Sequence, residues 1–355
     1  MAQHVAVAGG GIIGSTIAWK LARSGYRVTL IDARTLGSEA SHAGAGMLAP
    51  GGEVTTRSGW GDLCLAGARM YPEFVAELES ESGERIDYRR CGGIELALSD
   101  EEWTKLGERA IRQEEWGVPS RVMTPDELRA MVPELQTRNV AGARYYFHDG
   151  VVDPRDIMRA LRKALVRNGV TIREGAAVKE IQPGRPVTVV CAAERITADA
   201  AILSAGAWSG EARVPGMAIP RTFPVRGHLL GYRLAGWRLG PIVRHDHTYL
   251  LQRRSGVLIA GTTSERAGFN RMLDAAAVSD IRTRAEGLVP GLLRGIEPEA
   301  WLGFRPATDT LAPEIGELGG TRIWLAYGHY RNGILMAPET ARLVVSGIVA
   351  SLGTG

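Results

Sequence analysis

Cysteine is scarce in this sequence. Its 355 residues include three cysteines, Cys64, Cys91 and Cys191, which lie far apart along the chain. An odd number of scattered cysteines does not provide the disulfide framework that stabilises small secreted domains. None of the three belongs to a CxxC pair or a Cys/His cluster, so the usual spacing of a zinc site is missing too. The cysteines therefore predict a reducing, cytoplasmic environment and no metal site.

The sequence also has no large excess of positive or negative charge. The formal net charge is +3, and no run of five or more like charges occurs. Proteins that bind nucleic acid concentrate positive charge on one face or in one segment. The balanced composition therefore argues against a nucleic-acid partner.

Long apolar runs are missing as well. No stretch of 18 apolar residues occurs, and the apolar run near the N-terminus is interrupted by glycines and follows no basic segment. A membrane-spanning helix needs about 20 apolar residues, and a signal peptide begins with positive charge. We therefore expect no membrane partner. With 45% hydrophobic residues the chain can bury a large core, and its length suggests two domains.

The first 32 residues have the pattern of a nucleotide-binding unit. "HVAVA" predicts a buried strand, "STIAWKLARSG" a helix that ends at Gly25, and "YRVTLIDA" a second strand. Between the first strand and the helix, Gly9, Gly11 and Gly14 stand in GxGxxG register. A glycine-rich turn without a ligand is the alternative, but it does not explain why all parts of the unit occur together.

Each residue of this unit has a physical task. Gly9 allows a tight turn, Gly11 lets a pyrophosphate approach the backbone, and Gly14 lets the helix pack closely on the strand. The N-terminus of the helix offers free N–H groups to the phosphates. Asp32, which ends the second strand, can accept hydrogen bonds from a ribose and repels a 2′-phosphate. The unit predicts a dinucleotide other than NADP, and the choice between FAD and NAD stays open.

A loop of small residues, "SEASHAGAGMLAP" at 38–50, follows the second strand. Small residues let the backbone approach a flat ring system closely. A flexible surface loop is the alternative. Met47 and Leu48 argue against it, because they place apolar side chains inside the loop.

The middle of the chain predicts a second domain that interrupts the first. Segments 60–82 and 101–117 have helical patterns, and "CGGIELALS" at 91–99 predicts a strand. Further along, "TFPVRGHLLGYRL" and "VRHDHTYLLQRRSGVLIAGTTSE" alternate between apolar and polar residues. This period of two is typical of an antiparallel sheet.

Other segments return to the nucleotide-binding domain. A helix capped by Asp153, with Pro154 in its first turn, extends to about Asn168. "VTIREGAAVKEIQ" and "TADAAILSAGAWSG" then predict strands. At the C-terminus, the strand "IWLAYG", the turn "GHYRNG" and a helix to about Leu352 provide a second helix N-terminus that can face an anion.

The segment "HDHTYLL" predicts a polar pair beside a pocket. Taken as one continuous strand, it places His245, His247, Tyr249 and Leu251 on the same face. Two histidines at this spacing can bind a metal, but no third ligand lies nearby in the sequence. We therefore expect an interior-facing pair rather than a metal site.

Six segments together resemble the D-amino-acid oxidase superfamily of flavoproteins, and most closely the bacterial glycine oxidases of the thiamine pathway. They are "GGGIIGSTIAWKLA", "GAGMLAP", "LSAGAWSG", "HDHTYLLQR", "GFRPATDTLAPEIG" and "GHYRNGILMAP". Only the last is specific by itself, so the order and spacing of all six carry the resemblance, which extends over nearly the whole chain.

The resemblance implies an α/β fold, with a Rossmann-type FAD-binding domain interleaved with an α+β substrate domain built on an antiparallel sheet. The FAD-binding domain is expected to comprise residues 1–85, 148–215 and 300–355, and the substrate domain residues 86–147 and 216–299. FAD is expected to lie extended, from the N-terminal unit to the C-terminal turn. There a helix N-terminus stabilises the anionic reduced ring.

The resemblance also implies which residues bind FAD. Sarcosine oxidases of the wider family attach their flavin through a cysteine in the C-terminal part, where this chain has none after Cys191, so we expect non-covalent FAD. The residues implied in FAD binding are Gly9, Gly11, Ile12, Ile13, Gly14, Asp32, Ala33, Ser41, His42, Gly46, Met47, Val178, Ala205, Gly206, Trp208, Arg305, His329, Tyr330, Arg331, Asn332, Gly333 and Ile334.

Five residues are implied at the substrate. Arg305 in "GFRP" is expected to bind the substrate carboxylate, since a planar guanidinium fork matches a carboxylate; a surface ion pair is its alternative. Tyr249 is expected to donate its hydroxyl to the same carboxylate, and Arg331 to lie beside the amino group and the flavin. His247 and Met47 are expected to line the pocket.

The implied activity is oxidative deamination of glycine, sarcosine or another small amino acid, such as a D-amino acid. It yields an oxo acid, ammonia or an amine, and hydrogen peroxide from oxygen, with no side chain assigned as acid or base. One alternative is an FAD-dependent dehydrogenase for an amine or a D-amino acid such as D-hydroxyproline, with another electron acceptor. Another alternative is a dinucleotide-binding module without catalysis. Homo-oligomers are compatible with the sequence.

Overall fold

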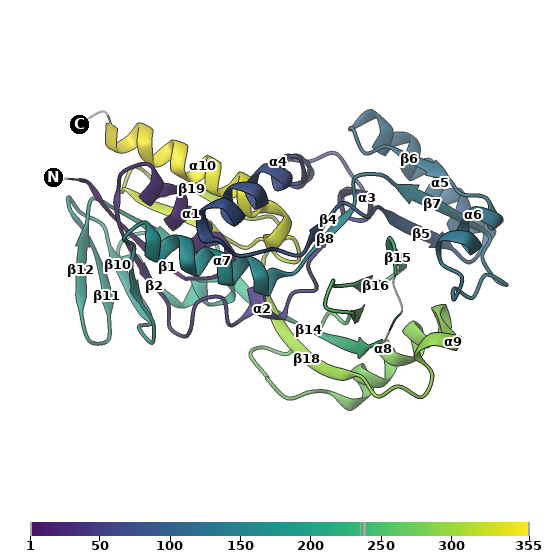
Figure 1. Cartoon of the computed structure of the whole chain (residues 1–355). Coiled ribbons are helices and arrows are strands. Elements are labelled where there is room, and N and C mark those ends of the chain that lie inside the picture. Colours follow the sequence, from purple (N-terminus) through teal and green to yellow (C-terminus); the bar gives the residue numbers. More distant parts are fainter. Residues whose placement is uncertain (1, 235, 237–238, 354–355) are drawn as a thin grey trace.

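The strands of the computed structural model, which describes residues 2–234, 236 and 239–353, form four sheets. Figure 1 shows the sheet that contains β1 at one end of the molecule, together with both chain termini, and the largest sheet at the other end. This arrangement of parallel and antiparallel sheets agrees with the expected α/β fold class.

The first sheet has six described strands in the order β19-β20-β13-β1-β2-β9. All neighbours are parallel except β19 and β20. Parallel strands need crossover connections, and helices on the faces of the sheet supply them. The strands are β1 (His4–Ala8), β2 (Arg27–Ile31), β9 (Thr171–Arg173), β13 (Ala200–Leu203), β19 (Glu314–Glu317) and β20 (Ile323–Tyr327).

The strand–loop–helix–strand prediction for the first 32 residues is confirmed. Helix α1 (Ile12–Arg23) connects β1 to β2, which pair in parallel with His4 opposite Arg27. The helix ends before Gly25, whose φ of 87° is readily adopted only by glycine. The local sequence signals were therefore sufficient to predict this unit.

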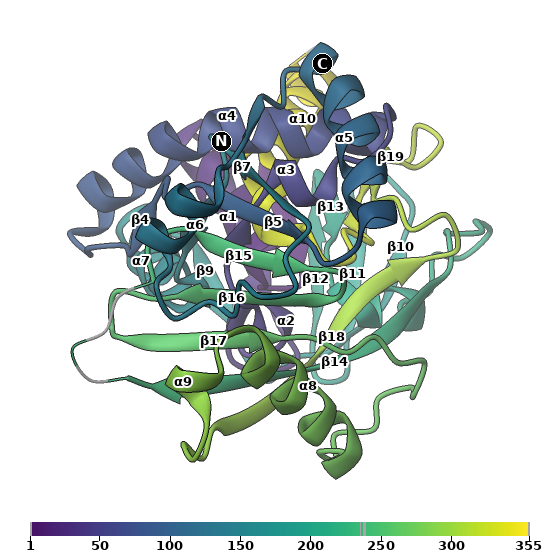
Figure 2. The same ribbon diagram turned by 90° about the vertical axis from the view of Figure 1, so that its right-hand side faces the viewer.

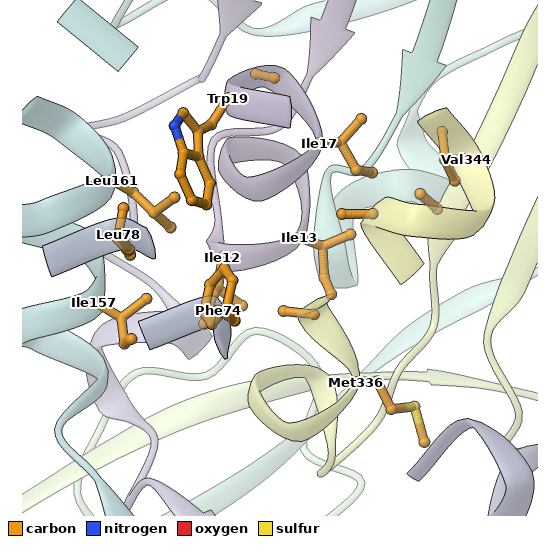
Figure 3. Packing of buried hydrophobic residues seen from close by; sticks show 14 of the residues in the cluster. Ile12, Ile13, Ile17, Trp19, Phe74, Leu78, Ile157, Leu161, Met336 and Val344 are labelled. Atoms are coloured by element: carbon orange, nitrogen blue, oxygen red, sulfur yellow. The ribbon is translucent and has the colours of Figure 1, made fainter. Parts of the chain in front are cut away.

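Four helices form the main core beside this sheet. Figure 3 shows Ile13 and Trp19 of α1 between side chains of α4 and α7 on one side and Met336 and Val344 of α10 on the other. All of these side chains are buried. Helix α1, near the N-terminus, therefore packs directly against α10, at the C-terminal end of the chain. The helices besides α1 are α4 (Gly59–Ser82), α7 (Pro154–Arg167) and α10 (Gly333–Gly353).

Helix α10 is the one helix in the described ranges that is long and apolar enough to cross a membrane. Half of its apolar window is buried inside the protein, where the helix packs against α1 and α4. Helices that are hydrophobic on most sides are also found in the cores of globular proteins. Its packing thus accounts for the apolar character of α10.

The largest sheet has eight described strands in the order β18-β14-β17-β16-β15-β5-β7-β6. Figure 2 shows its central strands side by side, with α8 and α9 on the outside. Its pairs are antiparallel except for β15 with β5. The strands are β5 (Gly93–Ala97), β6 (Ser120–Val122), β7 (Gly142–Tyr146), β14 (Thr222–Arg233), β15 (Ile242–His245), β16 (Thr248–Gln252), β17 (Val257–Gly261) and β18 (Glu299–Thr308).

The other described elements connect and cover these sheets. Two sheets of three strands have the orders β10-β11-β12 and β3-β8-β4. Their strands are β3 (Met47–Leu48), β4 (Tyr88–Arg89), β8 (Gly150–Val152), β10 (Val178–Gln182), β11 (Val187–Cys191) and β12 (Arg195–Ala198). The remaining helices are α2 (Ala40–Ala43), α3 (Pro50–Glu53), α5 (Asp100–Glu115), α6 (Pro125–Met131), α8 (Ala275–Leu288), α9 (Pro290–Leu293) and the 3₁₀ helix η1 (Gly206–Glu211). The domain boundaries stay a prediction.

Two sequence interpretations need correction. "VTIREGAAVKEIQ" gives two strands: β9 joins the parallel sheet, whereas β10 joins β11 and β12. "HDHTYLL" is not one strand, because His245 ends β15 and pairs with Thr248 of β16 across the turn Asp246–His247. Asp246 has a φ of 50°, a conformation that Asp tolerates in turns. Tyr249 and Leu251 do share one face of β16, but the expectation that His245 and His247 lie on that face with them was wrong.

Candidate active site

A cavity of about 1280 Å³ extends from the turn after β1 to the start of α10. This exceeds the roughly 300–1,000 Å³ of common ligand pockets, so a dinucleotide and a small substrate can share it. Of the residues expected at FAD and substrate, those that line it are Gly9, Gly11, Ile12, Ile13, Asp32, Ala33, Ser41, Gly46, Met47, Val178, Ala205, Gly206, Trp208, His247, Tyr249, Arg305, His329, Tyr330, Arg331, Asn332, Gly333 and Ile334.

Two of the expected residues lie off the cavity lining. Gly14 is buried behind the loop, where an added Cβ would lie 1.9 Å from the carbonyl oxygen of Gly9. This position matches its expected task in packing helix on strand. His42 is exposed on α2 and is not among the lining residues, so the structure does not bring it to the cavity.

The N-terminus of α1 fits a phosphate group. Its N-cap is Gly11, and the described helix has no acidic residue in its first turn. The N–H of Ile12 donates to Ser41 Oγ at 2.9 Å, and Gly11, Ile12 and Ile13 line the cavity. The positive end of the helix dipole is therefore open to an anion.

Asp32 holds the glycine-rich loop in place. Its Oδ2 accepts a hydrogen bond from the N–H of Gly10 at 2.7 Å, and its Oδ1 accepts one from the N–H of Arg34 at 2.7 Å. Burial raises the pKa of Asp32, and these two hydrogen bonds lower it. The residue thus lines the cavity where a ribose is expected and also stabilises the phosphate-binding turn.

A second helix N-terminus lies at the other end of the cavity. Helix α10 begins at Gly333, and its first turn as described contains no acidic residue. Next to it, the ring Nε2 of His329 lies 2.9 Å from Thr340 Oγ1. Burial lowers the pKa of His329 to about 3, so its imidazole is neutral at physiological pH. The positive potential at this end therefore comes from the helix rather than from His329.

Arg305 of β18 is held by the loop that follows β17. Its Nη1 donates to the carbonyl oxygen of Thr263 at 3.0 Å, and its Nη2 donates to Thr262 Oγ1 at 2.8 Å. Gly227 makes room for it, because a Cβ there would lie 2.2 Å from Nη1. Burial lowers the pKa of Arg305, and neighbouring Tyr249 raises it.

Arg305 differs from the other described arginines of the cavity because no carboxylate pairs with it. Among the arginines that line the cavity in the described ranges, only Arg305 has no carboxylate partner. The four others form ion pairs, which are Arg34–Glu39 at 2.9 Å, Arg244–Glu95 at 2.8 Å, Arg284–Asp280 at 2.8 Å and Arg331–Glu53 at 2.8 Å. Arg305 is partly buried, and a charge that is partly withdrawn from water without a partner is costly, so the site is suited to an anionic ligand.

Tyr249 of β16 and Arg305 of β18 lie on strands that are separated by β17 and β14, but both residues line the cavity and they interact electrostatically. The hydroxyl of Tyr249 faces Gly261, where an added Cβ would lie 2.4 Å from the oxygen. Burial raises the pKa of Tyr249 to about 12, although Arg305 lowers it. The hydroxyl is thus protonated at neutral pH and can donate a hydrogen bond.

His247, by contrast, lies exposed in the turn before β16, and its Nε2 is 3.6 Å from Oδ1 of its neighbour Asp246.

The sequence interpretation missed Glu53. This residue ends α3. Its Oε2 accepts a hydrogen bond from Asn332 Nδ2 at 3.0 Å and forms an ion pair with Arg331 Nε at 2.8 Å. Its side chain is 9% exposed and lies at the cavity. An acidic residue inside the small-residue segment "APGGEV" was the available signal.

A buried polar network lies beneath α3 and fixes it. The N–H of Gly51 donates to Asp149 Oδ1 at 2.9 Å, and Gln113 Nε2 donates to the carbonyl oxygens of Gly51 and Val54 at 2.9 and 2.8 Å. Arg244 pairs with Asp149 at 2.6 Å. Because the backbone of α3 and its C-cap is hydrogen-bonded to the buried side chains of Asp149 and Gln113, α3 is held in one position.

Comparisons with known proteins agree with these features. A family model described as FAD dependent oxidoreductase matches residues 4–346. The chain is 33% identical to glycine oxidase of Geobacillus kaustophilus over 345 residues, which cover 96% of this chain and 91% of that protein. It is 34% identical over 351 residues to the bifunctional protein ThiO/ThiG of a Synechocystis species, covering 96% of this chain and 51% of that protein.

A solved structure leads to the same family. The crystal structure of glycine oxidase from Geobacillus kaustophilus matches with a TM-score of 0.92 and 31% sequence identity, over 98% of this chain and 95% of that one. The two helix N-termini and the large cavity fit the cofactor of this family. The chain therefore belongs to the family of FAD-dependent oxidoreductases that includes the glycine oxidases.

Proposed function

We propose that this enzyme oxidises glycine, sarcosine or another small amino acid, such as a D-amino acid, and passes the electrons to oxygen. The products are an oxo acid, ammonia or an amine, and hydrogen peroxide. The observation that carries the proposal is the guanidinium of Arg305, which has no carboxylate partner within the described cavity. A substrate carboxylate would supply that partner.

The residues around Arg305 would orient the substrate. FAD, when bound, would supply the redox chemistry by accepting a hydride, which is two electrons and one proton, from the carbon that bears the amine. Arg305 would hold the carboxylate with its fork, and the neutral hydroxyl of Tyr249 would donate to it. Fixing the carboxylate at two points leaves the substrate few orientations, which is the main contribution that a protein makes to such a reaction.

The cofactor is proposed to be FAD without a covalent link. Cys64 and Cys191 are buried, and no cysteine follows Cys191 in the sequence. We expect the purified protein to be yellow, and acid precipitation to release its FAD into the supernatant, where absorbance measures it. Colour that stays with the precipitate would contradict the non-covalent proposal.

Small substrates are expected to react faster than large ones. Met47 and Tyr249 line the cavity near Arg305, so glycine, sarcosine and D-alanine should have higher kcat/KM values than D-phenylalanine. A peroxidase-coupled assay should show one hydrogen peroxide formed for each substrate consumed, without an added dye. A clear preference for D-phenylalanine would contradict the size argument.

The same samples distinguish an oxidase from a dehydrogenase. The enzyme is reduced anaerobically with glycine or sarcosine and then mixed with air. Rapid return of the flavin absorbance supports the oxidase, whereas a return over many minutes indicates a dehydrogenase with another acceptor. If no amino acid reduces the flavin, the result supports the alternative of a dinucleotide-binding module without catalysis. A cytoplasmic location, a homo-oligomer, and no nucleic-acid or membrane partner stay proposals.

A further inference from the structure

Glu53 and Arg331 form a charge pair inside the cavity of Arg305. Arg331 Nε lies 2.8 Å from Glu53 Oε2, and Asn332 donates to the same oxygen at 3.0 Å. Both charges act electrostatically on Arg305, since Arg331 lowers the pKa of Arg305 and Glu53 raises it. The pair is thus close enough to influence what binds next to Arg305.

The two members of the pair differ in their freedom to move. The side chain of Arg331 is 51% exposed, whereas that of Glu53 is 9% exposed. Glu53 also belongs to α3, whose backbone is bonded to the buried side chains of Asp149 and Gln113. The carboxylate of Glu53 is therefore fixed in place, and the more exposed guanidinium of Arg331 is held by its ion pair with Glu53.

We propose that Glu53 determines substrate specificity by neutralising Arg331, so that the site accepts amino acids with one carboxylate and rejects those with two. The inference rests on the proposed function, in which Arg305 binds the first carboxylate. A second carboxylate would meet Arg331 with the carboxylate of Glu53 2.8 Å from its guanidinium. A ligand carboxylate brought next to the largely buried carboxylate of Glu53 is repelled by it, and such repulsion between like charges is a common way of excluding wrong ligands.

Replacing Glu53 with glutamine tests this proposal directly. The variant keeps an oxygen that can accept from Asn332 but removes the charge. Binding of acetate, malonate and succinate is measured through changes in flavin absorbance, without turnover. We expect the affinity for malonate or succinate relative to acetate to rise by about 10-fold or more, as the repulsion is removed and Arg331 is freed. The kcat/KM of D-aspartate relative to D-alanine should rise in parallel.

Two further variants make the test specific. Asp280→Asn removes a negative charge from another ion pair of the same cavity, but Asp280 is 60% exposed, so the ratio should stay as in the wild type. In the double variant Glu53→Gln/Arg331→Gln, the gain for dicarboxylates should disappear. An equal gain in Asp280→Asn, or a gain that survives in the double variant, would overturn the proposal.

Arg331→Gln provides a test that does not depend on the folding of the Glu53 variant. It leaves the charge of Glu53 unpaired, so discrimination against malonate and succinate should become stronger. If the affinity for malonate or succinate relative to acetate is unchanged in both Glu53→Gln and Arg331→Gln, the role of Glu53 is refuted even if the wild type oxidises glycine. If no amino acid reduces the wild-type flavin, the proposed function itself has failed.

Discussion

Replacing Arg305 with alanine is expected to lower kcat/KM for glycine by roughly 30- to 5,000-fold, which corresponds to about 2–5 kcal/mol. The guanidinium is the one cavity arginine in the described ranges without a carboxylate partner, so its loss removes the charge that would bind the substrate carboxylate. The variant should stay folded and yellow. Steady-state kinetics and acetate binding measure the effect.

Lysine at position 305 should restore only part of the activity. A lysine ammonium is a point charge and cannot form the two parallel hydrogen bonds of a guanidinium. Arg233→Ala is a suitable control, because Arg233 is 80% exposed and lies 3.8 Å from Glu299 at the surface. If Arg305→Ala has the KM and the acetate affinity of the wild type, Arg305 does not bind the substrate.

Replacing Gly14 with alanine is expected to abolish FAD binding and to destabilise the protein by about 1–3 kcal/mol or more. The added Cβ would lie 1.9 Å from the carbonyl oxygen of Gly9 and 2.5 Å from Ser204 Oγ. Neither neighbour can move away easily, because Gly9 follows β1 and Ser204 follows β13 in the same parallel sheet. Chemical denaturation and FAD titration of the apoprotein measure the two effects.

Gly107→Ala is the matched control for this substitution. Gly107 also lies within a helix, α5, but no atom would lie within 4 Å of its added Cβ. Alanine there should stabilise the protein by about 0.5–1 kcal/mol, because glycine is a poor helix former. If Gly14→Ala binds FAD as tightly as the wild type, the packing role of Gly14 is refuted.

The sequence was informative where the relevant residues are neighbours in the chain. Gly9, Gly11 and Asp32 lie within one strand–loop–helix–strand unit, and the fold of that unit follows from its own hydrophobic pattern and turns. The start of α10 was predicted for the same reason, since the "GHYRNG" turn separates a strand from a helix.

It was misleading or silent where the structure depends on distant residues. A local signal was also overlooked in "HDHTYLL": four polar residues in succession, from His245 to Thr248, interrupt the alternation at the turn, and Asp is common in turns. The position of Glu53 depends on Asn332 and Arg331, which lie near the other end of the chain. Such a contact becomes visible only after the sheets are assembled, because no local pattern encodes it.

The cavity takes its two ends from opposite ends of the chain, with Ile13 in the first helix and His329 before the last. A ribosome adds about 5–20 residues per second, so roughly 15 to 60 seconds separate the synthesis of these two residues. Until α10 is made, the cavity lacks the wall that is expected to face the ring of the cofactor. Complete loading of FAD therefore follows the folding of α10 and is among the last events in the biosynthesis of the enzyme.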